Sequence, residues 1–191
     1  APPFTTSTLQ QEAFKKLRFS SKQTMMFAQQ LYETGLITYM RTDSVNLSDQ
    51  AVWAAKEAIN EIFGENYWAG FPRKYKTKSR LAQEAHEAIR PTEPERAPES
   101  LKNKLESQPA KLYDLIWRRF MATQMKEATF DTMSVEIINQ ISNIKNQNDI
   151  SKIKNYTFSA NGQTLKFDGF LKVYPIKYEE TELPSLEENE K

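Results

Sequence analysis

The sequence predicts an α+β chain, in which a mainly helical unit of about five or six helices surrounds a short extended segment and is followed by a β-rich partial domain. Apolar residues recur at helical spacing up to residue 127, whereas β-branched and aromatic residues alternate over 128–178. Charge is also segregated, with 19 basic and 15 acidic side chains in residues 1–130 but 7 and 10 in the remainder. We therefore expect domains at 1–127 and 128–178, and an acidic linker or tail at 179–191.

Two capping signals predict the first helices. The Ser-x-x-Gln spacing that begins at Ser7 allows a hydroxyl and an amide to satisfy each other's free backbone donors, and it predicts a helix over residues 8–17. The same spacing at Ser20 begins a second helix, which Gly35 can end in the left-handed conformation. Residues 36–40 are apolar and β-branched but too few for a helix, so we expect an extended run.

Three or four further helices are expected before residue 127. Ser48 opens one of them, which carries an apolar stripe and has Gly64 just past its end. The next ends where Arg90 precedes a proline, because the residue before a proline is biased away from the helical region. That helix covers residues 81–89, and the remaining expected helices cover 98–106 and 109–126.

The β-rich part has four expected strands. They cover residues 132–141, 156–160, 163–167 and 170–174. Asn161-Gly162 is a two-residue hairpin signal between the second and the third, and residues 142–155 read as a polar loop. A set of about 60 residues with so few strands looks incomplete by itself.

Composition excludes several classes of function. The 191 residues include no Cys and one His, which removes disulfides, Cys nucleophiles, thiolate zinc sites and motifs that need two imidazoles. No P-loop motif occurs, and no apolar run approaches the roughly 18 residues that cross a bilayer, so we expect a soluble protein with neither ATP nor membrane as a partner. The first residues have no start Met and no signal-peptide pattern, which suggests an internal piece of a longer protein.

Residues 36–44 form the most informative segment. Tyr39 is followed two and four residues later by Arg41 and Asp43, so a phenol, a cation and a carboxylate lie within reach of one another. A tyrosine in such a run is often a core or boundary aromatic, and Arg-x-Asp is a common surface pair. The spacing by itself therefore fits a reactive site and a purely structural role.

Two other segments carry charged groups suited to an anionic ligand. On the helix expected at 81–89, His86 and Arg90 are four residues apart and would face one phosphate together, although a single His is more often structural. Between residues 73 and 80, five cations occur without an acid, which fits either a footprint for an anionic polymer or a solvated loop. These cations are Arg73, Lys74, Lys76, Lys78 and Arg80.

Residues 2–11 (PPFTTSTLQQ), 35–44 (GLITYMRTDS) and 85–92 (AHEAIRPT) together resemble the active-site domain of type IA DNA topoisomerases. Their order and separations also match that family, and Met40 resembles its bacterial topoisomerase I branch. The likeness is strong over residues 1 to about 125. The later strands resemble part of the β-rich arch domain that follows in this family.

The resemblance implies transesterification on single-stranded DNA, in which Tyr39 forms a 5′-phosphotyrosine so that negative supercoils are relaxed without ATP. A phenol with a pKa of about 10 needs help from a cation or base, and the guanidinium of Arg41 suits the attacked phosphate. His86 would contact a DNA phosphate and shape the pocket, with proton transfer as an alternative. Asp43 would orient Arg41 or reach a neighbouring domain, and Arg90 would contact phosphate or pair with a nearby Glu. The other expected DNA contacts are Lys74, Lys76 and Lys78.

The resemblance further implies Mg²⁺, which a toprim domain would hold. This chain has no D-x-D pair, and Glu84 with Glu87 would leave a magnesium ion short of ligands. We therefore expect no metal or other cofactor in this chain, and we expect that the chain alone does not relax DNA. The expected partners are single-stranded DNA within negatively supercoiled DNA and the missing toprim and arch domains of the same enzyme. The expected compartment is bacterial cytoplasm.

Two other functions remain open from the sequence. One is a non-catalytic helical nucleic-acid-binding domain, which would use the cations of residues 73–80 together with stacking aromatic side chains. Those side chains are Tyr67, Trp68, Phe71 and Tyr75. The other is a protein-interaction module in which Trp53, Trp117 and the strand edges serve packing.

Overall fold

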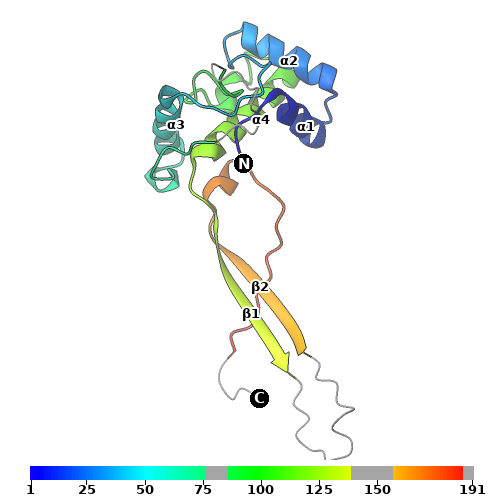
Figure 1. Ribbon diagram of the computed structural model, residues 1–191, viewed down its shortest axis with the longest axis vertical. Coiled ribbons are helices and arrows are strands. Elements are labelled where there is room, and N and C mark those ends of the chain that lie inside the picture. Colours follow the sequence, from blue (N-terminus) through cyan, green and yellow to red (C-terminus); the bar gives the residue numbers. More distant parts are fainter. Residues whose placement is uncertain (76–85, 139–156, 187–191) are drawn as a thin grey trace, which may run out of the picture. The chain divides into compact units, whose positions relative to one another are not determined.

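The computed structural model describes residues 1–75, 86–138 and 157–186. They belong to two compact units (Figure 1). The first comprises residues 1–127 and 169–176, and the second comprises the described residues within 128–168 and 177–191. No helix among the described residues is long and apolar enough to cross a membrane.

The first unit is helical. Its α-helices are α1 (Thr6–Leu17), α2 (Ser21–Glu33), α3 (Asp49–Ile62) and α4 (Ser107–Gln124). The described residues thus hold four α-helices, and the five or six predicted are not confirmed. The segment predicted as a helix over 98–106 begins as the short 3-10 helix η2 (Pro98–Leu101) and continues as turns; another 3-10 helix, η1, covers Glu65–Tyr67.

Capping geometry begins α1 two residues earlier than predicted. The capping box is formed by Thr5 and Thr8 rather than by Ser7: the Thr8 amide donates to Thr5 Oγ1 at 3.3 Å, and the Thr5 amide donates to Thr8 Oγ1 at 2.9 Å. At α2 the predicted box is confirmed, with Ser20 and Gln23 exchanging the corresponding bonds at 3.2 and 2.9 Å.

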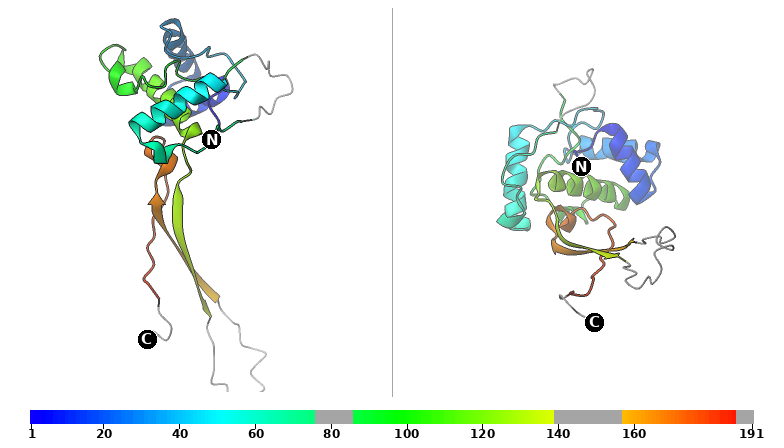
Figure 2. Two further views of the ribbon diagram at one scale, coloured as in Figure 1. Left: turned by 90° about the vertical axis from the view of Figure 1, so that its left-hand side faces the viewer. Right: turned by 60° about the horizontal axis from the view of Figure 1, so that its bottom comes forward.

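The core of the first unit lies around α4. In Figure 2, α4 runs between α3 on one side and α1 and α2 on the other, and it contacts all three. Side chains from each helix are fully buried there, including Leu9, Leu31, Ile59, Ile116 and Phe120. Burying such an apolar side chain stabilises a fold by about 1.5–3 kcal/mol. Because α4 contacts the other three helices, it is the element on which they are assembled.

The strand predicted over 170–174 is wrong. Residues Gly169–Lys172 form the 3-10 helix η4, and Val173 and Tyr174 are buried in the first unit. The Tyr174 hydroxyl donates to the Glu12 carboxylate at 2.9 Å, and Arg118 donates to the Val173 carbonyl at 3.3 Å. Apolar burial against helices, rather than pairing with a strand, therefore decides the structure of this segment.

The second unit contains an antiparallel pair, β1 (Thr129–Ile138) and β2 (Thr157–Phe167). The hairpin turn predicted at Asn161-Gly162 is wrong, because both residues lie inside β2, opposite Ser134 and Met133 of β1. The two strands predicted on either side of that turn are accordingly one strand. The polar loop predicted over 142–155 lies outside the described residues.

Candidate active-site groove

Three segments distant in sequence are bonded to one another: residues 4–6, 36–44 and 86–92. Isolated antiparallel bridges join Phe4 to Ile89 and Ile37 to Pro91. The Thr6 amide donates to the Thr42 carbonyl at 2.9 Å, which connects the first segment to the second. These are the segments that carry the family resemblance, and the fold brings them into contact.

The helix predicted within 81–89 is wrong over its described part, residues 86–89, which are not helical. Their backbone donors have distant partners: the Ala88 amide donates to the Asn46 carbonyl at 2.9 Å, and the Ile89 amide donates to the Phe4 carbonyl at 2.8 Å. Because these bonds replace those to the preceding turn, no helical face carries His86 and Arg90 together.

The backbone on both sides of Tyr39 is held firmly. Before it, the Thr38 amide donates to the Arg90 carbonyl at 2.9 Å and the Thr38 hydroxyl to the Ala88 carbonyl at 2.7 Å. After it, Met40 is 1% exposed and its carbonyl accepts from the Thr6 hydroxyl at 2.8 Å. The Tyr39 side chain itself is 43% exposed.

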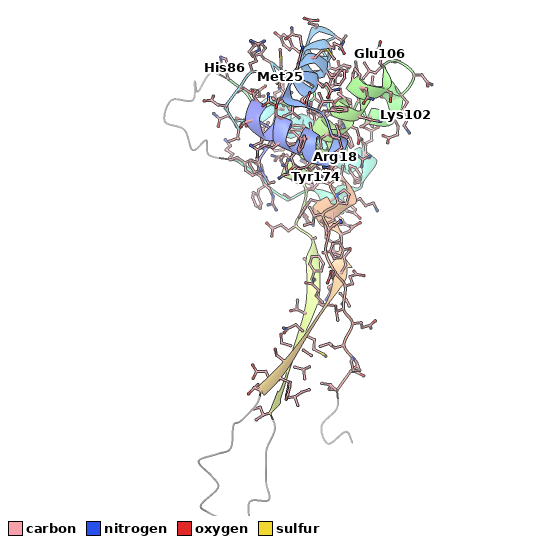
Figure 3. The ribbon with its side chains drawn as sticks, turned by 90° about the vertical axis from the view of Figure 1, so that its right-hand side faces the viewer. Arg18, Met25, His86, Lys102, Glu106 and Tyr174 are labelled. Carbon is pink, nitrogen blue, oxygen red and sulfur yellow. The ribbon has the colours of Figure 1, made fainter. Side chains whose placement is uncertain are left out.

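The Tyr39 side chain opens onto a groove of about 450 Å³. The lining residues are Tyr32, Thr38, Tyr39, Thr42, His86 and Glu87. His86 is half-buried and lies at the surface of the helical unit (Figure 3). The structure thus brings two of the predicted site residues, Tyr39 and His86, into one groove, whereas Arg41, Asp43 and Arg90 are not among its lining residues.

Burial alternates along residues 39–44. Met40, Thr42 and Ser44 are buried, whereas Tyr39, Arg41 and Asp43 are exposed. This period of two is that of an extended chain with one face on the core, so the three predicted functional side chains are on the solvent side together. No ion pair or hydrogen bond joins Arg41 to Asp43 within the described part of the chain, so the arrangement in which Asp43 orients Arg41 is not seen.

Arg90 pairs with Glu87. Its Nη2 and Nε atoms lie 2.6 and 3.2 Å from Glu87 Oε2, and Glu87 Oε1 accepts from the Ser48 amide at 2.6 Å, at the start of α3. Burial acts to raise the pKa of Glu87, but the hydrogen bonds from Ser48 and Arg90 outweigh it and hold that pKa below its ordinary value. The sequence left two roles open for Arg90, contact with a phosphate and pairing with a nearby Glu. The structure shows the ion pair, with Glu87.

The start of the basic segment is engaged with acidic groups. Arg73 Nη1 lies 3.1 Å from Glu127 Oε1, and the exposed Lys74 lies 3.5 Å from Asp49 Oδ1. Lys76 and Lys78 lie outside the described residues. Of the aromatic side chains expected to stack on a nucleic acid, Trp68 is buried and cannot stack on a base.

Sequence reasoning did not identify Tyr32 or Glu87 as parts of the groove. Tyr32 lies in the last turn of α2, seven residues before Tyr39 and on the other side of Gly35. The sequence feature that could have indicated Tyr32 is Gly35, because a glycine that reverses the chain brings the aromatic residues on its two sides close together. Elsewhere, no group of three or more His, Asp or Glu side chains among the described residues is arranged to hold a metal ion.

The fold and the groove together define a class: an α+β protein in which an exposed tyrosine and a histidine line one groove. The family model described as DNA topoisomerase matches residues 1–191, and the chain belongs to this family.

Relatives named DNA topoisomerase 1 are similar over most of this chain. That of Rickettsia bellii is 47% identical over 99% of this chain and 24% of its own length, and that of Mycobacterium leprae is 47% identical over 91% and 17%. The crystal structure of full-length topoisomerase I from Thermotoga maritima matches with a TM-score of 0.75 and 39% identity, over 97% of this chain and 29% of that one. This chain therefore spans between about a sixth and three tenths of the length of these relatives.

Proposed function

We propose that this chain is the part of a type IA DNA topoisomerase that carries the nucleophile, Tyr39. In the complete enzyme it would cleave and rejoin one strand of negatively supercoiled DNA through a 5′-phosphotyrosine. The observation that supports this proposal is the contrast at Tyr39, whose backbone neighbours are hydrogen-bonded on both sides while its side chain is exposed in a groove with His86. A nucleophile needs both a fixed position and access to its substrate.

The reaction exchanges one phosphate ester for another. The Tyr39 oxygen gives its proton to His86 or to water and attacks the phosphorus, and the bond from phosphorus to the 3′ oxygen breaks. The 3′ oxygen takes up one proton from the same source and leaves as a hydroxyl, so no net proton is gained or lost. The reverse attack by that hydroxyl rejoins the strand and restores the phenol. Because a phosphodiester is present at every stage, no ATP is required.

The side chains around Tyr39 have distinct proposed roles. Arg41 is exposed on the same side of the segment and would bind the non-bridging oxygens of the attacked phosphate, where a guanidinium stabilises developing charge. His86 would contact a neighbouring phosphate or accept the phenol proton, since it lines the same groove. Asp43 would reach a neighbouring domain, and Lys74 would contact DNA after leaving Asp49, an exposed pairing that costs little to break.

Magnesium belongs to a toprim domain outside this chain in this proposal. The described residues offer no cluster of ligands for it, so we assign no step in this chain to a metal. The chain alone would then bind no magnesium and relax no DNA. Its partners would be single-stranded DNA and the toprim and arch domains of the same bacterial cytoplasmic enzyme.

The test is Tyr39→Phe in the complete enzyme, incubated with negatively supercoiled DNA and magnesium. We expect relaxation and the denaturant-resistant DNA adduct to disappear while DNA binding is retained, because the change removes one oxygen from an exposed side chain. Tyr178→Phe is a matched control, since Tyr178 is 39% exposed and lies in the second unit. Retained relaxation and adduct in Tyr39→Phe would contradict the proposal, and loss of both with binding intact would contradict a non-catalytic DNA-binding domain.

A further inference from the structure

The Tyr39 side chain has little support of its own. Within the described residues no hydrogen bond or ion pair holds it, although hydrogen bonds fix Thr38 and Met40 on either side. A half-exposed tyrosine with a fixed backbone still has several staggered positions about its first side-chain bond. Some of these positions turn the hydroxyl away from the groove, so attack requires a further constraint.

The ring of Tyr32 supplies a contact of this kind. The Tyr32 and Tyr39 ring centroids are 5.3 Å apart and the ring planes make an angle of 69°, which is an edge-to-face pair. Both rings line the same groove, and Tyr32 is itself 40% exposed. The pair therefore forms at the surface where the substrate would bind.

The position of Tyr32 is fixed by the end of α2. The Gly35 amide donates to the Tyr32 carbonyl at 2.9 Å, and Gly35 has φ 73°, a left-handed conformation that reverses the chain. The Leu36 amide then donates to the Leu31 carbonyl at 2.9 Å. Tyr32 thus belongs to a hydrogen-bonded helix end, which is a more rigid support than a loop would be.

We propose that Tyr32 is a positioning residue, whose ring keeps the Tyr39 side chain directed into the groove. This inference rests on the proposed function, because it assumes that Tyr39 is the nucleophile. An edge-to-face pair is worth about 0.5–1.5 kcal/mol, which at 1.36 kcal/mol per tenfold corresponds to a change of about 2- to 13-fold in the population of the supported position. Loss of the pair should lower the rate of attack by a similar factor.

The experiment measures single-turnover cleavage of a single-stranded oligonucleotide by the complete enzyme with magnesium, with the covalent adduct trapped by denaturant. Tyr32→Leu removes the aromatic pair, and Leu is at least as favourable as Tyr in a helix, so folding is not at risk. Tyr32→Phe keeps the ring and loses the hydroxyl. Phe14→Leu is the matched control, since Phe14 is an exposed aromatic side chain of α1 that is not among the lining residues of the groove.

We expect Tyr32→Leu to form the adduct about 3- to 10-fold more slowly, with its affinity for a DNA of the same sequence in calcium or without metal unchanged. Tyr32→Phe should restore most of the rate, and Phe14→Leu should match the unmodified enzyme. An unchanged rate in Tyr32→Leu, an equal loss in Tyr32→Phe, or a loss of affinity that accounts for the slower reaction would each overturn the positioning role. Adduct formation by Tyr39→Phe would instead overturn the proposed function, so the two failures are distinguishable.

Discussion

Removing the Thr6 hydroxyl should destabilise the first unit and release the segment that carries Tyr39. Thr6 Oγ1 donates to the Met40 carbonyl at 2.8 Å and accepts from the Thr42 amide at 2.9 Å. Thr6→Val keeps a β-branched side chain of similar shape and deletes both bonds. Met40 and Thr42 are 1% and 7% exposed, so one carbonyl and one amide lose a partner where water has little access. Each such group costs about 1–3 kcal/mol, so for the two groups together we expect the free energy of unfolding to fall by about 2–6 kcal/mol.

Urea denaturation measures this loss. With a slope of about 2 kcal/mol per molar urea, the midpoint should fall by roughly 1–3 M. Thr34→Val is the matched control: the exposed Thr34 hydroxyl donates to the Gln30 carbonyl at 2.9 Å, and the Thr34 amide, which the change leaves in place, donates to the same carbonyl at 3.0 Å. The control should lose less than about 0.5 kcal/mol. Equal losses in the two variants would refute the argument that Thr6 anchors the Tyr39 segment.

Two further predictions concern stability. The pKa of Glu87 is lowered by folding, so the stabilisation from its bonds to Ser48 and Arg90 is present above its ordinary pKa of 4.5 and is lost as the pH falls through the folded value. In urea titrations, the difference in unfolding free energy between the unmodified chain and Glu87→Gln should therefore shrink between pH 7 and pH 3. A constant difference would contradict this prediction. Gly35 and Gly169 both have positive φ, but a Cβ would lie in open space at Gly35 and 2.5 Å from a backbone oxygen at Gly169. In thermal unfolding, Gly35→Ala should therefore lower the free energy of unfolding by about 1 kcal/mol, and Gly169→Ala should lower it by clearly more.

Elements that depend on neighbouring residues could be predicted from the sequence. The capping box at Ser20 is confirmed, Ser48 accepts from the Ala51 amide at 3.3 Å at the start of α3, and Gly35 has the left-handed conformation at the end of α2. In each case the donor, the acceptor and the backbone preference lie within four residues.

Elements decided by distant contacts could not be predicted in the same way. Ala88 and Ile89 have good helical spacing, but their amides donate to the carbonyls of Asn46 and Phe4, more than 40 residues away. Asn161-Gly162 has the composition of a turn, yet it pairs with β1 because the residues on both sides of it continue the same register. A local pattern gives no weight to such partners, and for the same reason the proximity of His86 to Tyr39 followed from the family resemblance and not from spacing.

The alternation along residues 39–44 separates stability from chemistry within one segment. Its even-numbered side chains are buried, and the backbone of Met40 and Thr42 is hydrogen-bonded to Thr6. Just before the segment, Thr38 is hydrogen-bonded to the carbonyls of Ala88 and Arg90. Its odd-numbered side chains are exposed and carry the phenol, the guanidinium and the carboxylate. A residue that packs in the core is held by many contacts and cannot reach a substrate, whereas an exposed residue reaches it but is poorly fixed. Placing the two kinds of residue alternately lets the buried set fix the position of the exposed set, and the remaining freedom, rotation of the Tyr39 side chain, is the one that Tyr32 restricts.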